Sequence, residues 1–129
     1  MKIAVFENEY ESVKGSFETA NLVDFNNELD VHVYPSSQLA NLLLIDQFSV
    51  IFIDIDLSTK SELDGFGLIK KLDEISNLIN KKIIILTGNN KIEDALKSRN
   101  IKSDIYHIII KPTNFLEISK AITRVTNPR

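Results

Sequence analysis

Five short apolar segments constrain the fold more than any other feature of this 129-residue sequence. Each segment is rich in β-branched or aromatic residues, and most do not alternate apolar with polar positions. Strands that are buried on both faces have this composition, because helices cover both sides of a parallel sheet. The predicted strands are Ile3–Phe6, Val31–Tyr34, Val50–Ile53, Ile83–Leu86 and Ile108–Ile110.

The segments between these strands have the apolar spacing of helices. Asn90 with Glu93 and Asn114 with Glu117 predict capped starts for the last two helices, and Ser36 or Ser37 is a candidate cap for the second. The residues predicted to face inward are Tyr10, Val13, Phe17 and Ala20 in the first helix, Leu39, Leu42 and Leu43 in the second, Phe66, Ile69, Leu72, Ile75 and Ile79 in the third, Ile92, Ala95 and Leu96 in the fourth, and Phe115, Ile118, Ile122 and Val125 in the fifth.

A strand followed by a helix, repeated five times, predicts an α/β fold with right-handed crossovers. The simplest arrangement is a flavodoxin-like, doubly wound sheet of five parallel strands in the order 2-1-3-4-5, with five helices. The length suits a single domain over residues 1–129, whereas an eight-stranded barrel needs about twice as much chain. We expect the last four residues, Thr126–Arg129, to form a frayed end.

Composition excludes several classes of function. The net charge of −3 argues against a nucleic-acid-binding surface, which normally carries a basic excess. The absence of cysteine excludes disulfides, thiolate chemistry and Cys-based zinc sites. No segment has the length of a membrane span, and the N-terminal apolar run is too short for a signal peptide. We therefore expect a cytoplasmic protein that binds neither nucleic acid nor membrane.

Polar residues follow four of the five predicted strands. In an open α/β sheet the carboxyl ends of the strands share one edge, and ligands bind there, at the switch point between the first and third strands. We therefore expect acids, a hydroxyl group and a lysine to converge at this edge. The residues concerned are Glu7-Asn8-Glu9, Asp54 with Asp56, Thr87-Gly88 and Lys111-Pro112.

Each of these residues alone has an ordinary structural explanation. Strand ends are commonly polar, Glu7 or Glu9 suits the first turn of a helix, and Thr87-Gly88 is typical of a turn. Their occurrence together, at four strand ends that the predicted sheet places near one another, favours a functional site.

This ordered set resembles the receiver domain of two-component response regulators, and the resemblance covers essentially the whole chain. Its most specific parts are the spacing from Asp54 to Thr87 to Lys111 and the sequence IIIKP that ends at Pro112. The pair Asp64-Gly65 also resembles the Asp-Gly that follows the phosphorylation loop in that family.

The resemblance implies a phosphorylation-dependent signalling switch rather than an enzyme. Asp54 would be the phosphoacceptor, Thr87 the switch hydroxyl and Lys111 a phosphoryl contact. Mg²⁺ would be held by Glu7, Asn8, Asp54 and the main-chain carbonyl of Asp56. These roles come from the family and not from the spacing of the residues.

The resemblance also implies partners. The phosphoryl donor would be a phosphohistidine on a histidine kinase or a histidine phosphotransfer protein, as in a phosphorelay. A downstream protein would bind the surface of the helix predicted after Asn90, the strand Ile108–Ile110 and the helix predicted after Asn114. Dimerisation through these two helices is common in the family, so a homodimer is compatible with the resemblance.

The sequence departs from the family pattern at several positions. The usual acidic pair is Glu7-Asn8, and because Asn8 adds no charge we expect weak Mg²⁺ binding; Asp56 could restore part of that charge. The link Leu57–Leu63 is a few residues longer than usual and lacks its customary proline. Ile108 stands where the family has an aromatic residue, so an aromatic switch coupled to Thr87 would require Tyr106 to take that role.

Two alternative functions remain open at this point. A pseudo-receiver would keep the fold as a docking module that is never phosphorylated, as Asn8 and Ile108 favour. A haloacid-dehalogenase-like phosphatase also has an Asp-x-Asp motif after a strand, like Asp54-Ile55-Asp56, but it needs a later pair of acids. After Lys111 the only acid is Glu117, within a predicted helix.

Overall fold

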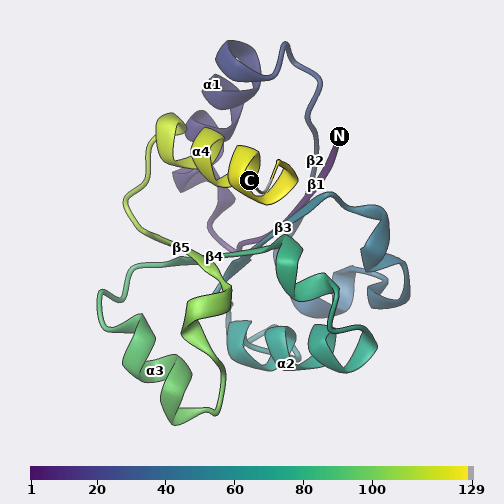
Figure 1. The fold of residues 1–129 in the computed structure, drawn as a ribbon, viewed down its shortest axis with the longest axis vertical. Helices are drawn as coiled ribbons and strands as arrows, with labels where there is room; N and C mark the ends of the chain where they lie inside the picture. The colour runs from purple at the N-terminus through teal and green to yellow at the C-terminus, as the bar shows by residue number, and fades with distance from the viewer. Residues whose placement is uncertain (128–129) are drawn as a thin grey trace.

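The strands form one parallel sheet in the order β2-β1-β3-β4-β5 in a computed structural model, which describes residues 1–127 (Figure 1). This confirms the predicted class and strand order, and each strand is one residue longer than predicted. The last two residues of the predicted frayed end, Pro128 and Arg129, lie outside the described residues. The strands are β1 (Lys2–Phe6), β2 (Asp30–Tyr34), β3 (Val50–Asp54), β4 (Ile83–Thr87) and β5 (His107–Ile110).

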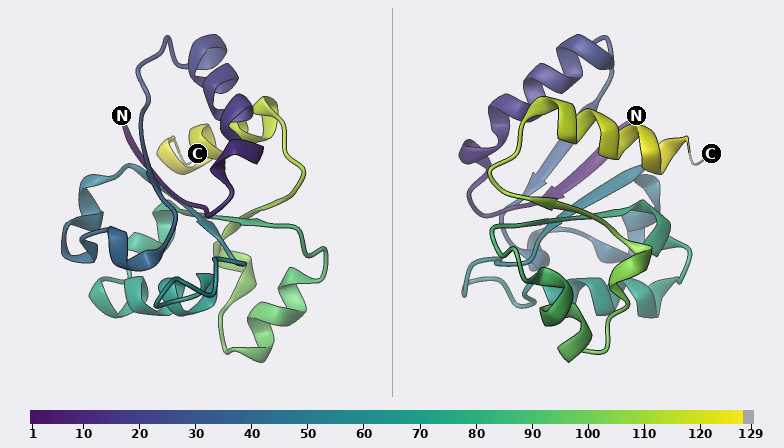
Figure 2. Two further views of the ribbon diagram at one scale, coloured as in Figure 1. Left: turned by 180° about the vertical axis from the view of Figure 1, so that it is seen from behind. Right: turned by 60° about the vertical axis from the view of Figure 1, so that its left-hand side comes forward.

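Helices cover both faces of this sheet. The views in Figures 1 and 2 place α1 (Lys14–Asp24) and α4 (Phe115–Thr126) on one face, and α2 (Gly65–Ile75) and α3 (Ile92–Ser98) on the other. Successive strand residues point to opposite faces, so an uninterrupted apolar strand contributes to two cores at once. Toward α1 and α4 point Ile3, Val5, Val50, Phe52, Ile84 and Leu86, and toward α2 and α3 point Ala4, Phe6, Ile51, Ile53, Ile83 and Ile85.

The predicted inward faces of the first and last helices are confirmed. Phe17 of α1 meets Phe52 of β3 edge to face, with ring centroids 4.9 Å apart. The side chain of Asn114 accepts a hydrogen bond from the backbone N–H of Glu117 at 3.0 Å, so the predicted cap of α4 is confirmed. None of the helices within residues 1–127 is long and apolar enough to cross a membrane.

The connection from β2 to β3 differs from the prediction. It contains two 3₁₀-helices, η2 (Ser37–Leu39) and η3 (Leu42–Gln47), where the sequence predicts an α-helix. Leu39 and Leu43 are exposed, so the prediction that they face inward is wrong. Side chains three residues apart share a face in a 3₁₀-helix, so Leu42 packs against the core as predicted, together with the buried Ile45. The side chain of Asn41 accepts from the N–H of Leu43 and begins η3.

Side-chain hydrogen bonds also lie at the start of α2 and in the turn before α3. Asp64 caps α2 by accepting from the N–H of Gly67 at 2.7 Å. The predicted cap of the fourth helix is wrong, because α3 begins after Lys91 without a side-chain cap. The side chain of Asn89 forms a turn there by accepting from the N–H of Lys91 at 2.9 Å. The remaining 3₁₀-helices within the described residues are η1 (Tyr10–Ser12), η4 (Ile79–Lys82) and η5 (Ser103–Ile105).

Gly65 allows α2 to begin directly against the end of β3. A Cβ atom at this position would lie 2.4 Å from Cα of Ile55 and 2.6 Å from the carbonyl oxygen of Asp54. Both neighbours are backbone atoms, so they could yield only if the strand or the helix moved. A glycine is therefore required for α2 to approach the carboxyl end of β3 this closely.

Replacing Gly65 by alanine should lower the free energy of unfolding by about 2 kcal/mol or more, because the new methyl group overpacks backbone atoms. Urea denaturation would measure the loss. Gly15→Ala is the matched control: apart from its chain neighbours and its own helix backbone, no atom lies within 4 Å of the added Cβ, and alanine in a helix should leave stability unchanged or raise it by up to about 1 kcal/mol. A Gly65→Ala protein as stable as the unsubstituted chain would contradict this account.

Candidate functional site

Three charged side chains meet at the carboxyl edge of the sheet. Nζ of Lys111 donates to Oε1 of Glu7 at 2.8 Å and lies 3.6 Å from Oδ1 of Asp54. Glu7 is fully buried, Asp54 is 2% exposed and the Lys111 side chain is 22% exposed. The lysine therefore lies between the two carboxylates and solvent.

The strand register brings these residues together. Phe6 pairs with Ile53, so Glu7 and Asp54 are the next residues on two adjacent strands. Thr87 pairs with Ile110, and the N–H of Lys111 donates to the carbonyl of Thr87 at 2.7 Å. The convergence predicted from the sequence is thus confirmed for Glu7, Asp54 and Lys111, with Thr87 joined to Lys111 through the backbone.

Electrostatics distinguish the two carboxyl groups. Burial opposes the charge on Glu7, but its hydrogen bonds with Asp54 and Lys111 outweigh this and lower its pKa. Burial, the hydrogen bond with Glu7 and the charge of Glu7 together raise the pKa of Asp54 from 3.8 to about 7, although the N–H of Asp56 and the charge of Lys111 oppose the rise. At neutral pH, Glu7 therefore holds the negative charge more firmly than Asp54 does.

Lys111 keeps its charge in this setting. Burial alone would lower the pKa of its ammonium group, yet the hydrogen bond to Glu7 and the charges of Asp54 and Glu7 raise it. A buried carboxylate such as Glu7 requires a partner of this kind, since an uncompensated buried charge is strongly unfavourable.

Asp54 and Thr87 also bond the loops that follow them. Oδ1 of Asp54 accepts from the N–H of Asp56 at 3.0 Å, and Oγ1 of the buried Thr87 accepts from the N–H of Asn89 at 3.1 Å. In this structure the hydroxyl of Thr87 thus holds the loop before α3.

The donor set for a divalent cation is small. Asn8 and Asp56 are exposed at the rim, next to the buried Glu7 and Asp54. Within residues 1–127 no cluster of three or more acidic or histidine side chains is placed to hold a metal ion. One observation nevertheless fits a cation: Oε2 of Glu7 is buried and accepts no hydrogen bond from the described residues while Asp54 is ionised, so the two neighbouring carboxylates could then share a cation.

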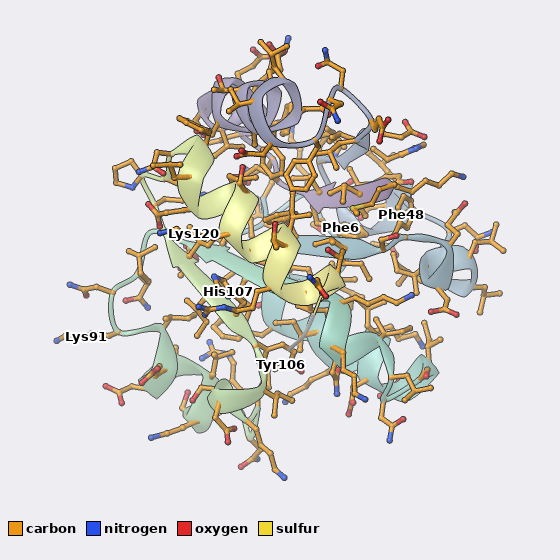
Figure 3. The ribbon with its side chains drawn as sticks, turned by 45° about the horizontal axis from the view of Figure 1, so that its top comes forward. Phe6, Phe48, Lys91, Tyr106, His107 and Lys120 are labelled. Carbon is orange, nitrogen blue, oxygen red and sulfur yellow. The ribbon has the colours of Figure 1, made fainter. Side chains whose placement is uncertain are left out.

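Tyr106 does not replace the aromatic residue that is missing at Ile108. His107 pairs with Ile84, which places Tyr106 beside the start of β4, whereas Thr87 ends that strand. The hydroxyl of Tyr106 donates to Oδ1 of Asn80 at 3.3 Å, on the α2 side of the sheet. Figure 3 shows Tyr106 and His107 at the β5 edge, with His107 nearer to α4. The possibility that Tyr106 couples to Thr87 is therefore wrong.

Sequence reasoning missed the contacts that position the loop after Asp56. Gly65 fixes the far end of this loop, and the resemblance to Asp-Gly was the only sign of its importance. Ser37 and Ser61 bond to each other across the rim. Two serines in loops 24 residues apart leave no periodic pattern, so no sequence signal could have paired them.

Comparison with solved structures places the fold among known ones. A receiver domain protein from Clostridium thermocellum is 20% identical, with a TM-score of 0.70, and the match covers 98% of this chain and 94% of that one. A receiver domain protein from Methanospirillum hungatei JF-1 is 19% identical, with a TM-score of 0.71 and coverage of 98% and 93%. The receiver domain of NtrX from Brucella abortus is 21% identical, with a TM-score of 0.68 and coverage of 98% and 99%.

The chain has the fold of a response regulator receiver domain. No family model and no curated protein matches the sequence. The receiver fold accounts for nearly the entire chain, and its carboxyl edge is where Glu7, Asp54 and Lys111 meet.

The raised pKa of Asp54 makes stability depend on pH. A carboxyl group with a raised pKa in the folded state costs stability once it ionises, so this cost grows from about pH 4 and is complete above about pH 7. Asp54→Asn should therefore gain stability relative to the unsubstituted chain over this range, by a few kcal/mol at pH 8. Chemical denaturation of both proteins from pH 4 to 9 would measure the difference. A difference that does not vary with pH would contradict the assignment.

Proposed function

We propose that this chain is a receiver-type signalling switch, formed by residues 1–129, that accepts a phosphoryl group on Asp54. The observation that carries the proposal is the position of the Lys111 ammonium group, 2.8 Å from Glu7 and 3.6 Å from Asp54. This pairing neutralises charge beside Asp54 and supplies a cation where a phosphoryl dianion would sit.

In the proposed reaction a carboxylate oxygen of Asp54 attacks the phosphorus of a phosphohistidine. The new O–P bond forms as the P–N bond breaks, and the imidazole nitrogen leaves with the electron pair. A carboxylate is a weak nucleophile toward a dianion, so neutralisation and positioning supply most of the catalysis. Lys111 neutralises charge, and the hydrogen bond from the N–H of Asp56 to Oδ1 positions Asp54.

A weakly bound Mg²⁺ belongs to the proposal. The buried Oε2 of Glu7, which has no donor beside it when Asp54 is ionised, supports it, and the ligands would be Glu7, Asn8, Asp54 and the main-chain carbonyl of Asp56. When bound, the ion would neutralise the charge on the phosphoryl oxygens. Asn8 offers an oxygen without charge, so these residues fit a weak site better than a tight one.

The phosphoryl group would then act on Thr87 and Lys111. Added negative charge favours a hydroxyl or ammonium group that turns toward it. If the hydroxyl of Thr87 turns to the phosphoryl group, it gives up the N–H of Asn89 and frees the loop before α3. We propose that this changes the surface of α3, β5 and α4, where a downstream protein or a second copy of the chain would bind.

The proposed phosphoryl donor is a histidine kinase or a histidine phosphotransfer protein in the cytoplasm. Under this proposal the chain is a signalling module and not an enzyme, because each phosphoryl transfer modifies Asp54 instead of turning over a substrate.

A pseudo-receiver is the second candidate. Two observations favour it: Asp54 is 2% exposed behind Lys111, and Asn8 is exposed and carries no charge. In that case the fold would serve as a constitutive docking module, and the ion pairs of Lys111 with Glu7 and Asp54 would only stabilise the fold.

Incubation with phosphoramidate or acetyl phosphate and Mg²⁺ separates these candidates. The intact mass should rise by one hydroxylamine-sensitive phosphoryl group, because an acyl phosphate forms on Asp54. Asp54→Asn should show no gain, whereas Asp104→Asn, at an exposed aspartate in η5 before the start of β5, is the matched control and should keep it. If the unsubstituted protein gains no mass, the pseudo-receiver is favoured; turnover of a small phosphate ester would favour a phosphatase.

Restoring the second acid should strengthen the metal site. Asn8→Asp adds a charged oxygen at the exposed rim, and we expect Mg²⁺ to bind about tenfold more tightly, since ligand charge governs affinity for hard cations. Amide shifts followed by NMR during a Mg²⁺ titration would give the dissociation constants. Asn41→Asp adds the same charge at the residue that caps η3 and should leave the affinity unchanged. Equal gains from both substitutions would mean that Asn8 is not a ligand.

A further inference from the structure

The residues Leu57–Leu63, between Asp56 and Asp64, form a segment that we call the strap. Hydrogen bonds on either side of the strap hold it close to Asp54. At its start, the N–H of Asp56 donates to Oδ1 of Asp54 at 3.0 Å. At its end, the N–H of Gly65 donates to the carbonyl of Ile55 at 3.2 Å. Leu57 is buried and anchors the strap to the core on the α2 side. Its first residues therefore depend directly on the position of Asp54.

The middle of the strap is fastened to η2. The N–H of the buried Ser37 donates to Oγ of Ser61 at 2.8 Å, and Oγ of Ser37 accepts from the N–H of Leu63 at 3.0 Å. The side chain of Gln38 bonds both the carbonyl of Lys60, at 2.9 Å, and the N–H of Glu62, at 2.9 Å. We call Ser37, Gln38 and Ser61 the latch.

The latch connects the site to the least regular part of the fold. Two of its residues belong to η2, and η2 and the following η3 are 3₁₀-helices, whose hydrogen bonds are weaker than those of α-helices. Three large apolar side chains, those of Leu39, Leu43 and Leu44, are 61%, 83% and 57% exposed there. A segment with few buried contacts opens at low cost and can respond to a small change at its attachment.

A second possible route for such a signal, through an aromatic side chain on β5 coupled to Thr87, lacks that aromatic residue. Ile108 stands where an aromatic residue would couple to Thr87, and Tyr106 is bonded to Asn80 near the opposite end of β4. The strap, by contrast, is joined to Asp54 at one end and to η2 in its middle by hydrogen bonds of 2.8 to 3.0 Å.

We propose that the latch transmits the state of Asp54 through the strap to η2 and η3. Loss of the bond between Asp54 and Asp56 would loosen the strap, break the contacts of Ser61 and Gln38, and free η2. The claim that η2 responds to phosphorylation rests on the function proposed above. The mechanical coupling between Asp54 and η2 does not depend on that function. A phosphoryl group would act by repelling the exposed carboxylate of Asp56.

A mutant cycle tests the coupling without any phosphoryl group. Asp54→Ala removes the acceptor of the Asp56 N–H, Ser61→Ala removes the latch, and the double variant removes both. Hydrogen exchange of the η2 amides, measured by NMR and referenced to the amides of β4, should be about fivefold faster in each single variant. The double variant should be no faster than Ser61→Ala alone, because the two changes act through one path.

Two controls separate this coupling from general loosening. Asp54→Asn keeps an oxygen acceptor for the Asp56 N–H and should retain protection of η2. Ser98→Ala removes a serine hydroxyl that bonds within α3 and should have no effect on η2. Unchanged exchange of η2 in Asp54→Ala would overturn the proposal, and so would fully additive effects in the double variant.

A final comparison uses protein treated with phosphoramidate and Mg²⁺, with the modified fraction determined by mass. Exchange in η2 should accelerate in the phosphorylated chain but not in phosphorylated Ser61→Ala. Equal acceleration in both would overturn the latch as the route. Failure of Asp54 to accept a phosphoryl group would overturn the readout and the proposed function together, while the mutant cycle would still decide whether the latch couples Asp54 to η2.

Discussion

The ammonium group of Lys111 is the interaction on which the carboxyl edge of this molecule depends. It bonds a fully buried carboxylate, Glu7, and lies 3.6 Å from a second one, Asp54. Without a cation, two acids buried side by side could not both ionise, and one would be held protonated. The raised pKa of Asp54 and the lowered pKa of Glu7 show that the balance is already uneven. A small change in charge at this edge therefore redistributes charge among all three groups.

The sheet could be predicted from the sequence because the information is local. Runs such as Val50–Ile53 and Ile83–Leu86 indicate burial on both faces, and their alternation with helices makes the order 2-1-3-4-5 the simplest arrangement. From these, the meeting of Glu7, Asp54 and Lys111 follows as geometry. The connection Ser37–Gln47 was not predictable in the same way: its leucines fit an α-helical face, but Asn41 caps a new 3₁₀-helix within it, and tertiary contacts override the helical pattern.

The strap shows a further limit of sequence reasoning. The length of the strap is visible in the sequence, yet its conformation depends on Ser37 and Gln38, which belong to η2. A longer connection costs little closure entropy, so it is tolerated wherever it finds partners. Here its partners join the site to η2 and η3, the part of the fold that departs from the prediction. The long strap and the irregular η2 are thus joined by the same hydrogen bonds.

A titration with beryllofluoride, a mimic of the phosphoryl group, in the presence of Mg²⁺ tests the central claim most directly. If Asp54, Lys111 and Glu7 form a phosphoryl site, saturable amide shifts should appear by NMR at Asn8, Asp56, Gly88 and Lys111, and Asp54→Ala should abolish them. The absence of saturable shifts, or shifts that persist in Asp54→Ala, would contradict the claim that this edge of the sheet binds a phosphoryl group.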